Sequence, residues 1–468
     1  MEIDITKEIE RFHQFLNIEN NENIIFSGIF GIGKSYFIDK YFNHSYKEDY
    51  IPIYLTPVNY SVANNEDIFE YIKVDILMQL LQKTPCEFRD EKINFSVGAY
   101  FYLKNNAIDL LSSIATMAEK VKFGTDIISK LIKLKSNIDQ FITDNSKNEE
   151  KETLDFINAM SFQKGSIYEN NAITQIIQSL IKNAKSNDQP AKEIVLVIDD
   201  LDRIDPEHIF RILNILSAHN NFCGTDENKF GFDKTILVCD IDNIKHIYSA
   251  KYGINVDFNG YIDKFYSKEI YTFDNANNII SKLSSMLMTV VAPGESDIHI
   301  NTQSSNNFSI SCKIILSGLI NNHSISLRTL LNNMNSKYFN HRTKTYYGEV
   351  NPANFGSIII FKFIRSLFCT PKCFQDAIYN LQSHHLDLKS PERYHALICS
   401  FIILADYGNN KLKAGSFTYE EMKYTIPEGV VSHGTAFLNR DVDKPISIKP
   451  IELIKNALDN YTTKFANL

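Results

Sequence analysis

The strongest constraint on the fold is a glycine-rich segment near the N-terminus, where residues 28–35 read GIFGIGKS and match the pattern G-x-x-x-x-G-K-[ST]. The apolar run at residues 24–26 predicts a short buried strand before it, and the apolar spacing of residues 36–42 predicts a helix after it. Such a loop can hold phosphate, because glycines let backbone N–H groups curl around oxygens and the helix directs its positive end at the same anion. The segment therefore predicts a phosphate loop.

Two side chains of this loop have expected roles in nucleotide binding. Lys34 is expected to reach the β- and γ-phosphates, and Ser35 to give its hydroxyl to Mg²⁺, which neutralises charge that Lys34 alone cannot. We expect the loop to face solvent and Lys34 to have no apolar packing. The expected nucleotide-binding residues are Gly28, Ile29, Phe30, Gly31, Ile32, Gly33, Lys34, Ser35 and Tyr36.

Strands and helices alternate around and beyond the loop. Each further strand is a short run of aliphatic residues, and each helix shows apolar residues at helical spacing. The expected strands are residues 50–55, 194–198, 235–239 and 269–273, and the expected helices include residues 66–81 and 172–185. This alternation favours an α/β fold with a parallel, doubly wound sheet.

Acidic residues crowd the end of the strand at residues 194–198, which continues into Asp199, Asp200, Leu201, Asp202 and Arg203. Carboxylates at the end of a buried strand are costly unless a cation lies there, and in a phosphate-loop protein that cation is Mg²⁺. The pattern is that of a Walker B segment. Asp240, which closes the next strand, is expected at the same sheet edge, where it can sense the γ-phosphate or position water.

The alternation stops twice along the chain. Between residues 84 and 170 a helix-prone apolar stretch leads into a charged segment, and from about residue 276 onward the chain reads as mainly helical. We therefore expect residues 1–83 and 171–275 to form the P-loop NTPase core. The other expected parts are an inserted helical subdomain at 84–170, a helical lid at 276–345 and a C-terminal helical domain at 346–468.

Composition restricts the setting. The formal net charge of −8 argues against unspecific binding of nucleic acid, and the most apolar candidate span, residues 107–121, is too short and too charged to cross a membrane. Seven scattered cysteines indicate reduced thiols in a cytoplasm. Only Cys369 and Cys373 are close together, and they read as two buried small residues rather than as a metal site.

The phosphate loop together with the D-D-L-D-R-I run at residues 199–204 resembles the KAP family of P-loop NTPases. The likeness continues through residues 236–252 and 260–265, and it covers roughly residues 1–340. The resemblance implies an additional-strand (ASCE) core, Mg-ATP as nucleotide, a bacterial cytoplasm, and frequent association with antiviral or mobile-element functions. The chain departs from the family in two ways. Many members carry a pair of membrane helices between the Walker segments, whereas the insertion here is not membrane-like, and the C-terminal third resembles no known pattern.

The same resemblance implies residue roles. Asp199 would hold Mg²⁺ through water, and Asp200 would polarise the attacking water. Arg328 resembles the arginine that related ATPases place in a helical lid to touch the γ-phosphate. The expected catalytic residues are Asp200, Lys34, Asp240 and Arg328, and the expected metal ligands are Ser35 and Asp199.

These residues favour an ATPase whose hydrolysis switches an oligomeric assembly or a partner, with antiviral defence as its setting and a homo-oligomer as its form. The alternative is a nucleotide-gated scaffold with little turnover that recruits a separate effector encoded nearby. A nucleic-acid-translocating ATPase is less favoured, because the chain is acidic and no aromatic and basic groove is evident. Arg203 leaves two interpretations open: it completes a neighbour's site, or it pairs with Asp202 or Asp205 of its own loop.

Overall fold

The computed structural model describes residues 3–60, 68–83, 172–187, 192–220, 228–287, 291–292, 298–299, 307–334, 356–426, 436–438 and 448–466. The expected inserted subdomain at 84–170 lies outside the described residues. Contacts divide the chain into two compact units. The first, called the sheet unit here, comprises Thr6–Gly28 and Lys34–Phe273; the second, called the helical unit, comprises Met1–Ile5, Ile29–Gly33 and Asp274–Leu468.

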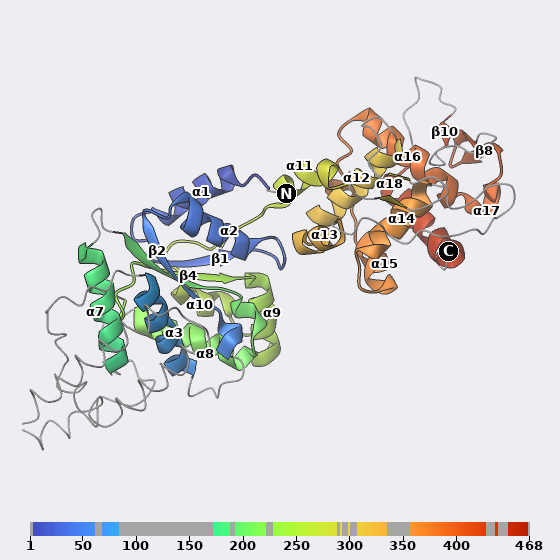
Figure 1. Ribbon diagram of the computed structural model, residues 1–468. Coiled ribbons are helices and arrows are strands. Elements are labelled where there is room, and N and C mark those ends of the chain that lie inside the picture. The colour runs from blue at the N-terminus through green and yellow to red at the C-terminus, as the bar shows by residue number, and fades with distance from the viewer. Residues whose placement is uncertain are drawn as a thin grey trace, which may run out of the picture. The chain divides into compact units, whose positions relative to one another are not determined.

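A five-stranded parallel sheet forms the centre of the sheet unit (Figure 1). Its strands are β1 (Asn23–Ser27), β2 (Tyr50–Leu55), β3 (Glu193–Ile198), β4 (Lys234–Cys239) and β5 (Tyr271–Thr272). They lie in the order β2-β3-β4-β1-β5, and every neighbouring pair is parallel. Strand β4 thus lies between the phosphate-loop strand β1 and the Walker B strand β3, which confirms the additional-strand core that the resemblance implied.

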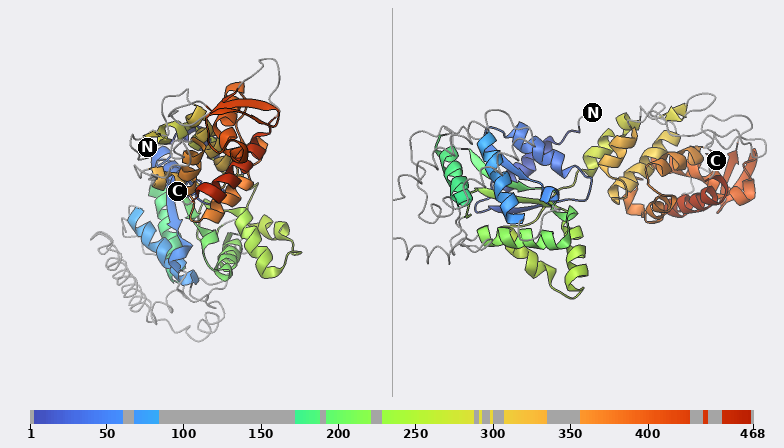
Figure 2. Two further views of the ribbon diagram at one scale, coloured as in Figure 1. Left: turned by 90° about the vertical axis from the view of Figure 1, so that its right-hand side faces the viewer. Right: turned by 60° about the horizontal axis from the view of Figure 1, so that its bottom comes forward.

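Helices cover both faces of this sheet, as the doubly wound prediction requires (Figures 1 and 2). One face carries α1 (Thr6–Leu16) and α2 (Lys34–Lys40), which continues as a π-helical turn at Tyr41–Ser45. The other carries α3 (Ile68–Lys83), α7 (Ala172–Asn187), α8 (Pro206–Asn220), α9 (Ile241–Tyr252) and α10 (Phe258–Ile262). Short 3₁₀ turns occur at Pro57–Tyr60, Leu201–Arg203 and Asp263–Phe265.

Adjacent residues of β1 pack on opposite faces of the sheet, each against a different set of buried side chains. Successive side chains of a strand point to opposite faces. Ile25 belongs to the hydrophobic core shared with the helices α3, α7, α8 and α9. Phe26 instead packs among aromatic rings, 5.2 Å from the ring of Phe12 in α1 and 5.4 Å from that of Phe37 in α2. The strand is therefore buried on both sides, which fixes the position from which the phosphate loop leaves the sheet.

The helical unit is organised around α16 (Pro391–Ala405), in which residues 396–404 are all buried. It packs against α12 (Asn307–Asn321), α14 (Gly356–Ser366) and α18 (Pro450–Asn460). One polar contact lies inside this core, since the Ser311 hydroxyl donates to that of Ser400 at 2.9 Å. The remaining helical segments are α11 (Ala276–Leu287), α13 (Leu327–Met334), α15 (Pro371–Tyr379), α17 (Tyr407–Asn410), a 3₁₀ turn at Ser383–His385 and a π-helical turn at Tyr461–Phe465.

The mainly helical character expected for this region is confirmed, but two small antiparallel sheets were not anticipated. One pairs β6 (Val291–Ala292) with β7 (Ile298–His299), and the other joins β8 (Gly415–Tyr419), β9 (Met422–Ile426) and β10 (Phe437–Leu438). The β8–β9 turn uses Glu420 and Glu421 at φ values of 45° and 67°. Glycine or asparagine normally marks such a turn, so this hairpin gave no sequence signal. Within the described parts of the chain, none of the helices is long and apolar enough to cross a membrane.

Candidate active site

The phosphate loop leaves β1 with the backbone shape that its glycines allow. Gly31 has a φ of 78° and Gly33 a φ of 105°, values that side chains with a Cβ rarely adopt. The backbone N–H of Gly28 donates to the carbonyl of Cys239 at 3.1 Å, so the start of the loop is tied to the end of β4. A loop that is fixed at its start and turned by positive-φ glycines can present its N–H groups to an anion.

Lys34 begins α2, and its side chain turns back toward the loop. Its Nζ donates to the Gly28 carbonyl at 2.6 Å, and the residue is only 8% exposed. The expectation that this lysine faces solvent without packing is therefore wrong, because the residue is buried and its ammonium is bonded to the backbone. The next two residues, Ser35 and Tyr36, are exposed in the first turn of the helix.

The carboxyl end of β3 carries the acidic cluster in a tight turn. The N–H of Asp199 donates to the Leu55 carbonyl of β2 at 2.9 Å, which extends the parallel ladder to this residue. Asp199 Oδ1 then accepts from the N–H of Asp200 at 2.8 Å. Asp200 has a left-handed backbone with a φ of 56°, and its Oδ1 forms an ion pair with Arg203 Nε at 3.0 Å. Of the two interpretations left open for Arg203, a contact within its own loop is thus present, with Asp200 as partner.

The acidity of Asp200 differs from that of an ordinary aspartate. Burial is the main cause that raises the pKa of its carboxyl, and the negative charge of Asp199 raises it further. The positive charges of Arg203 and Lys34 lower the same pKa in part. Asp200 is therefore a stronger base than an exposed aspartate, and it lies within the field of the phosphate-loop lysine.

The ends of β1, β3 and β4 are joined by side-chain hydrogen bonds. Ser27 Oγ, at the end of β1, accepts from the N–H of Ile241 at 3.1 Å, immediately after β4. Asp202 is buried, and its Oδ2 accepts from Asn243 Nδ2 at 3.2 Å. These contacts place the phosphate loop, the Walker B segment and the end of β4 at one sheet edge. Asn243 was not among the expected site residues, since no motif marks it.

Asp240 lies at this edge, as its position after β4 suggested, but its carboxylate caps a helix. Oδ1 accepts from the N–H groups of Asp242 and Asn243 at 3.2 and 3.3 Å, at the start of α9. This is the hydrogen bonding of an N-cap residue. A contact between Asp240 and phosphate or water stays a prediction.

The expected metal ligands fit Mg²⁺ in their chemistry. Magnesium is a hard cation that prefers oxygen donors and usually keeps several waters. Ser35 is an exposed residue that carries a hydroxyl, and Asp199 is a partly buried residue that carries a carboxylate. The residues present would therefore suit this ion.

Residues 29–33 belong by their contacts to the helical unit, where they lie against the start of α13. A Cβ added at Gly31 would be 2.6 Å from Ser326 Cβ. The guanidinium carbon of Arg328 lies 5.6 Å from the ring centroid of Phe30, a cation–π distance. The structure thus places Arg328 beside a residue of the loop, and its contact with a γ-phosphate stays a prediction.

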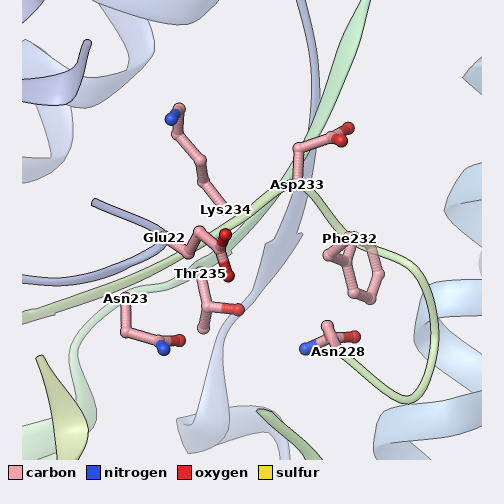
Figure 3. A pocket seen from close by; sticks show the side chains of 7 residues that line it. All are labelled: Glu22, Asn23, Asn228, Phe232, Asp233, Lys234 and Thr235. Atoms are coloured by element: carbon pink, nitrogen blue, oxygen red, sulfur yellow. The ribbon is translucent and has the colours of Figure 1, made fainter. Parts of the chain in front are cut away.

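A small hollow lies elsewhere in the sheet unit, at the amino ends of β1 and β4 (Figure 3). Glu22, Asn228 and Thr235 are among its lining residues. Its volume of about 10 Å³ is near the limit for one water molecule and far too small for a nucleotide. Because the phosphate loop follows the carboxyl end of β1, this hollow lies at the opposite sheet edge.

The fold and the two motifs define a P-loop NTPase. The model of the KAP family P-loop domain matches residues 6–344, and the chain belongs to this family. No curated protein matches the chain. Among solved structures, the Aeropyrum pernix ORC2 protein in ADPNP-ADP complexes is similar at a TM-score of 0.28 and 10% identity, over 99% of this chain and 95% of that one. A likeness at this level carries no argument about function.

Proposed function

We propose that this chain binds Mg-ATP at the phosphate loop and hydrolyses it, and that hydrolysis switches an oligomeric assembly or a partner. One observation carries the proposal: Asp200 has a pKa raised by burial and is still within the electrostatic reach of Lys34. A base and a phosphate-binding lysine at one sheet edge are the parts that phosphoryl transfer to water requires.

Each residue has a role in this proposal. Lys34 and the loop N–H groups bind the β- and γ-phosphates, and for this the Lys34 ammonium exchanges its bond to Gly28 for phosphate oxygens. Ser35, and Asp199 through water, would hold Mg²⁺, which would neutralise charge on the phosphates. Asp200 accepts a proton from the attacking water. The 3₁₀ turn at Leu201–Arg203, which follows Asp200, holds the Asp200 carboxylate in place for that step.

Measuring ATP turnover of Asp200→Asn tests this role. Turnover should fall by about two to four decades, as expected for the loss of a general base, while ATP binding is retained. Asp205→Asn is the matched control, because Asp205 lies in the same acidic segment and its Oδ1 accepts from the N–H of Glu207, a bond that asparagine preserves. Unchanged turnover in Asp200→Asn, or weakened binding at an unchanged rate, would exclude Asp200 as the base.

A second function, the nucleotide-gated scaffold with little turnover, is favoured by the ion pair between Asp200 and Arg203. A guanidinium that holds the carboxylate limits its capacity to accept a proton. Under this alternative the wild type binds ATP but hydrolyses it slowly, and Arg203→Gln turns over faster. Under the main proposal Arg203→Gln gives no such gain.

The biological setting belongs to the same proposal and is supported by the family alone. We assign the chain to antiviral defence in a bacterial cytoplasm, with an effector protein encoded nearby as partner. Residues 276–345 would act as the lid, followed by the C-terminal helical domain at residues 346–468. Phage plaque counts on cells that carry the wild type or Lys34→Ala test the setting: equal counts would remove it and leave the ATPase assignment untouched.

A further inference from the structure

Two cysteines lie side by side on the surface of the helical unit, at the start of α15. Cys369 Sγ and Cys373 Sγ are 3.7 Å apart, and both residues are exposed. The sequence interpretation of two buried small residues is therefore wrong. Of the other cysteines within the described ranges, all are buried: Cys239, Cys312 and Cys399.

We propose that Cys369 and Cys373 form a reversible dithiol–disulfide site, which a hydroperoxide oxidises and a dithiol reductant restores. Cys373 is the attacking thiol, and Cys369 is the resolving thiol.

The backbone around the pair is held on both sides. Thr370, the N-cap of α15, accepts at Oγ1 from the N–H of Cys373 at 3.1 Å. Arg365 Nη1 donates to the carbonyl of Phe368 at 2.8 Å, immediately before Cys369. Phe374, immediately after Cys373, is buried in the core. Because the sulfurs already lie within 3.7 Å, rotation of the side chains is the main motion needed to bring them to about 2.05 Å, the length of a disulfide bond.

The two thiols differ from the buried ones in reactivity. Hydrogen bonding from the Thr370 side chain, and then from Cys369, lowers the pKa of the Cys373 thiol, so more of it is thiolate at neutral pH. Burial raises the pKa of Cys312 to about 12 and that of Cys399 to about 12. An oxidant in solution should therefore react at Cys373 first.

The chemistry balances in two steps. The Cys373 thiolate attacks one oxygen of the hydroperoxide, the O–O bond breaks, and Cys373 becomes a sulfenic acid while the other oxygen leaves as water or an alcohol after protonation. The Cys369 sulfur then attacks the sulfenic sulfur, the S–S bond forms, and the sulfenic oxygen leaves as water with the Cys369 proton. The two sulfurs lose two electrons, which the O–O bond receives.

A structural metal is a weaker use of the same pair. Stable zinc sites in proteins take four ligands from cysteine, histidine or carboxylates. In the part of the chain that the structure describes, no group of three or more such residues could hold a metal ion.

The test uses the full chain, reduced, freed of reductant and then treated with hydrogen peroxide. Trypsin cuts after Arg365, Lys372 and Lys389, so a disulfide would join peptide 366–372 to peptide 373–389. We expect this linked pair in a non-reducing mass spectrum and its disappearance after dithiothreitol. Independent oxidation of each cysteine to a sulfonic acid, a link to another cysteine or no reaction would each overturn the proposal.

Four variants distinguish the roles of the residues. In Cys369→Ser the reaction should stop at the sulfenic acid of Cys373, which dimedone traps, and in Cys373→Ser the linked pair should be absent. Thr370→Val should slow the alkylation of Cys373 by iodoacetamide at neutral pH, and Thr370→Ser should restore it. An equal alkylation rate in all three forms of residue 370 would contradict the activation of Cys373. None of these measurements depends on ATP turnover.

Discussion

Arg203 makes two contacts with Asp200, the residue immediately before its own 3₁₀ turn. Its Nε lies 3.0 Å from Asp200 Oδ1, and its backbone N–H donates to the Asp200 carbonyl at 3.2 Å. The left-handed backbone of Asp200 makes these contacts feasible within three residues. The expected base of the site and the arginine of the D-D-L-D-R motif therefore act on each other directly. Any change at Arg203 should be visible in the titration of Asp200.

Arg203→Gln should shift the pH dependence of ATP turnover. The positive charge of Arg203 lowers the pKa of Asp200 against the larger effect of burial, so its removal raises that pKa. Asp200 accepts a proton only when it is deprotonated, and the acid limb of the kcat profile should therefore move to higher pH. Arg211→Gln, which changes an exposed arginine of α8, is the control. An acid limb at the same pH in both variants would argue against Asp200 as the titrating base.

Lys34→Ala should weaken ATP binding by about 100-fold or more, since charge-assisted hydrogen bonds are worth about 1.5–3 kcal/mol each. Lys47→Ala is the control, because Lys47 is exposed and its contact with Glu48 is a surface ion pair at 3.8 Å. Isothermal titration with a non-hydrolysable analogue measures both. Because Lys34 is buried and bonded to Gly28, a thermal unfolding curve should accompany the titration. Equal affinity in a folded Lys34→Ala would remove the site assignment.

Gly31→Ala should reduce ATP affinity about ten-fold, because alanine at a left-handed φ is strained by about 1–2 kcal/mol. The φ of Gly31 is 78°, and a new Cβ would also meet Ser326 Cβ at 2.6 Å. The double variant Gly31→Ala with Ser326→Gly should recover only part of the affinity, since it removes the clash and leaves the backbone strain. Gly408→Ala is the control, because nothing lies within 4 Å of a Cβ there. Full recovery would show that the clash alone matters.

The sheet and its functional edge could be predicted because their signals are local. The phosphate loop and the acidic D-D-L-D-R motif each follow a run of apolar residues. The structure has strands β1 and β3 at these two runs. The position of β4 between them follows from no local pattern, since strand order is set by crossover connections. Only the resemblance to a family supplied it.

Other features could not be predicted from spacing alone. The motif does not show that Lys34 is buried and bonded to the Gly28 carbonyl. The Asp200–Arg203 pair requires a left-handed aspartate that sequence does not mark. Asp240 was placed at the correct edge, but its use as an N-cap depends on where α9 begins. The exposure of Cys369 depends on which side of the segment before α15 faces the core. Each of these is decided by tertiary packing.

The last prediction concerns the assembly of subunits, for which Arg203 and Arg328 are differently placed. Arg203 has a partner in its own loop, Asp200, whereas Arg328 is an exposed residue of α13 beside Phe30. An arginine already held within its own chain is poorly placed to complete a neighbour's site, because its donor fork is partly used. We therefore expect assembly to depend on the nucleotide and not on Arg203.

Mass photometry with and without a non-hydrolysable ATP analogue measures this directly. The wild type should shift from monomers to oligomers with the analogue, Arg203→Ala should shift in the same way, and Lys34→Ala should stay monomeric because it does not hold the nucleotide. Turnover per subunit of the wild type should rise with protein concentration. Higher concentration favours the oligomer, and we expect subunits to activate one another only within it. Loss of assembly in Arg203→Ala would give that arginine a role between subunits. A monomer under every condition, with turnover per subunit independent of concentration, would instead make the chain a self-contained switch.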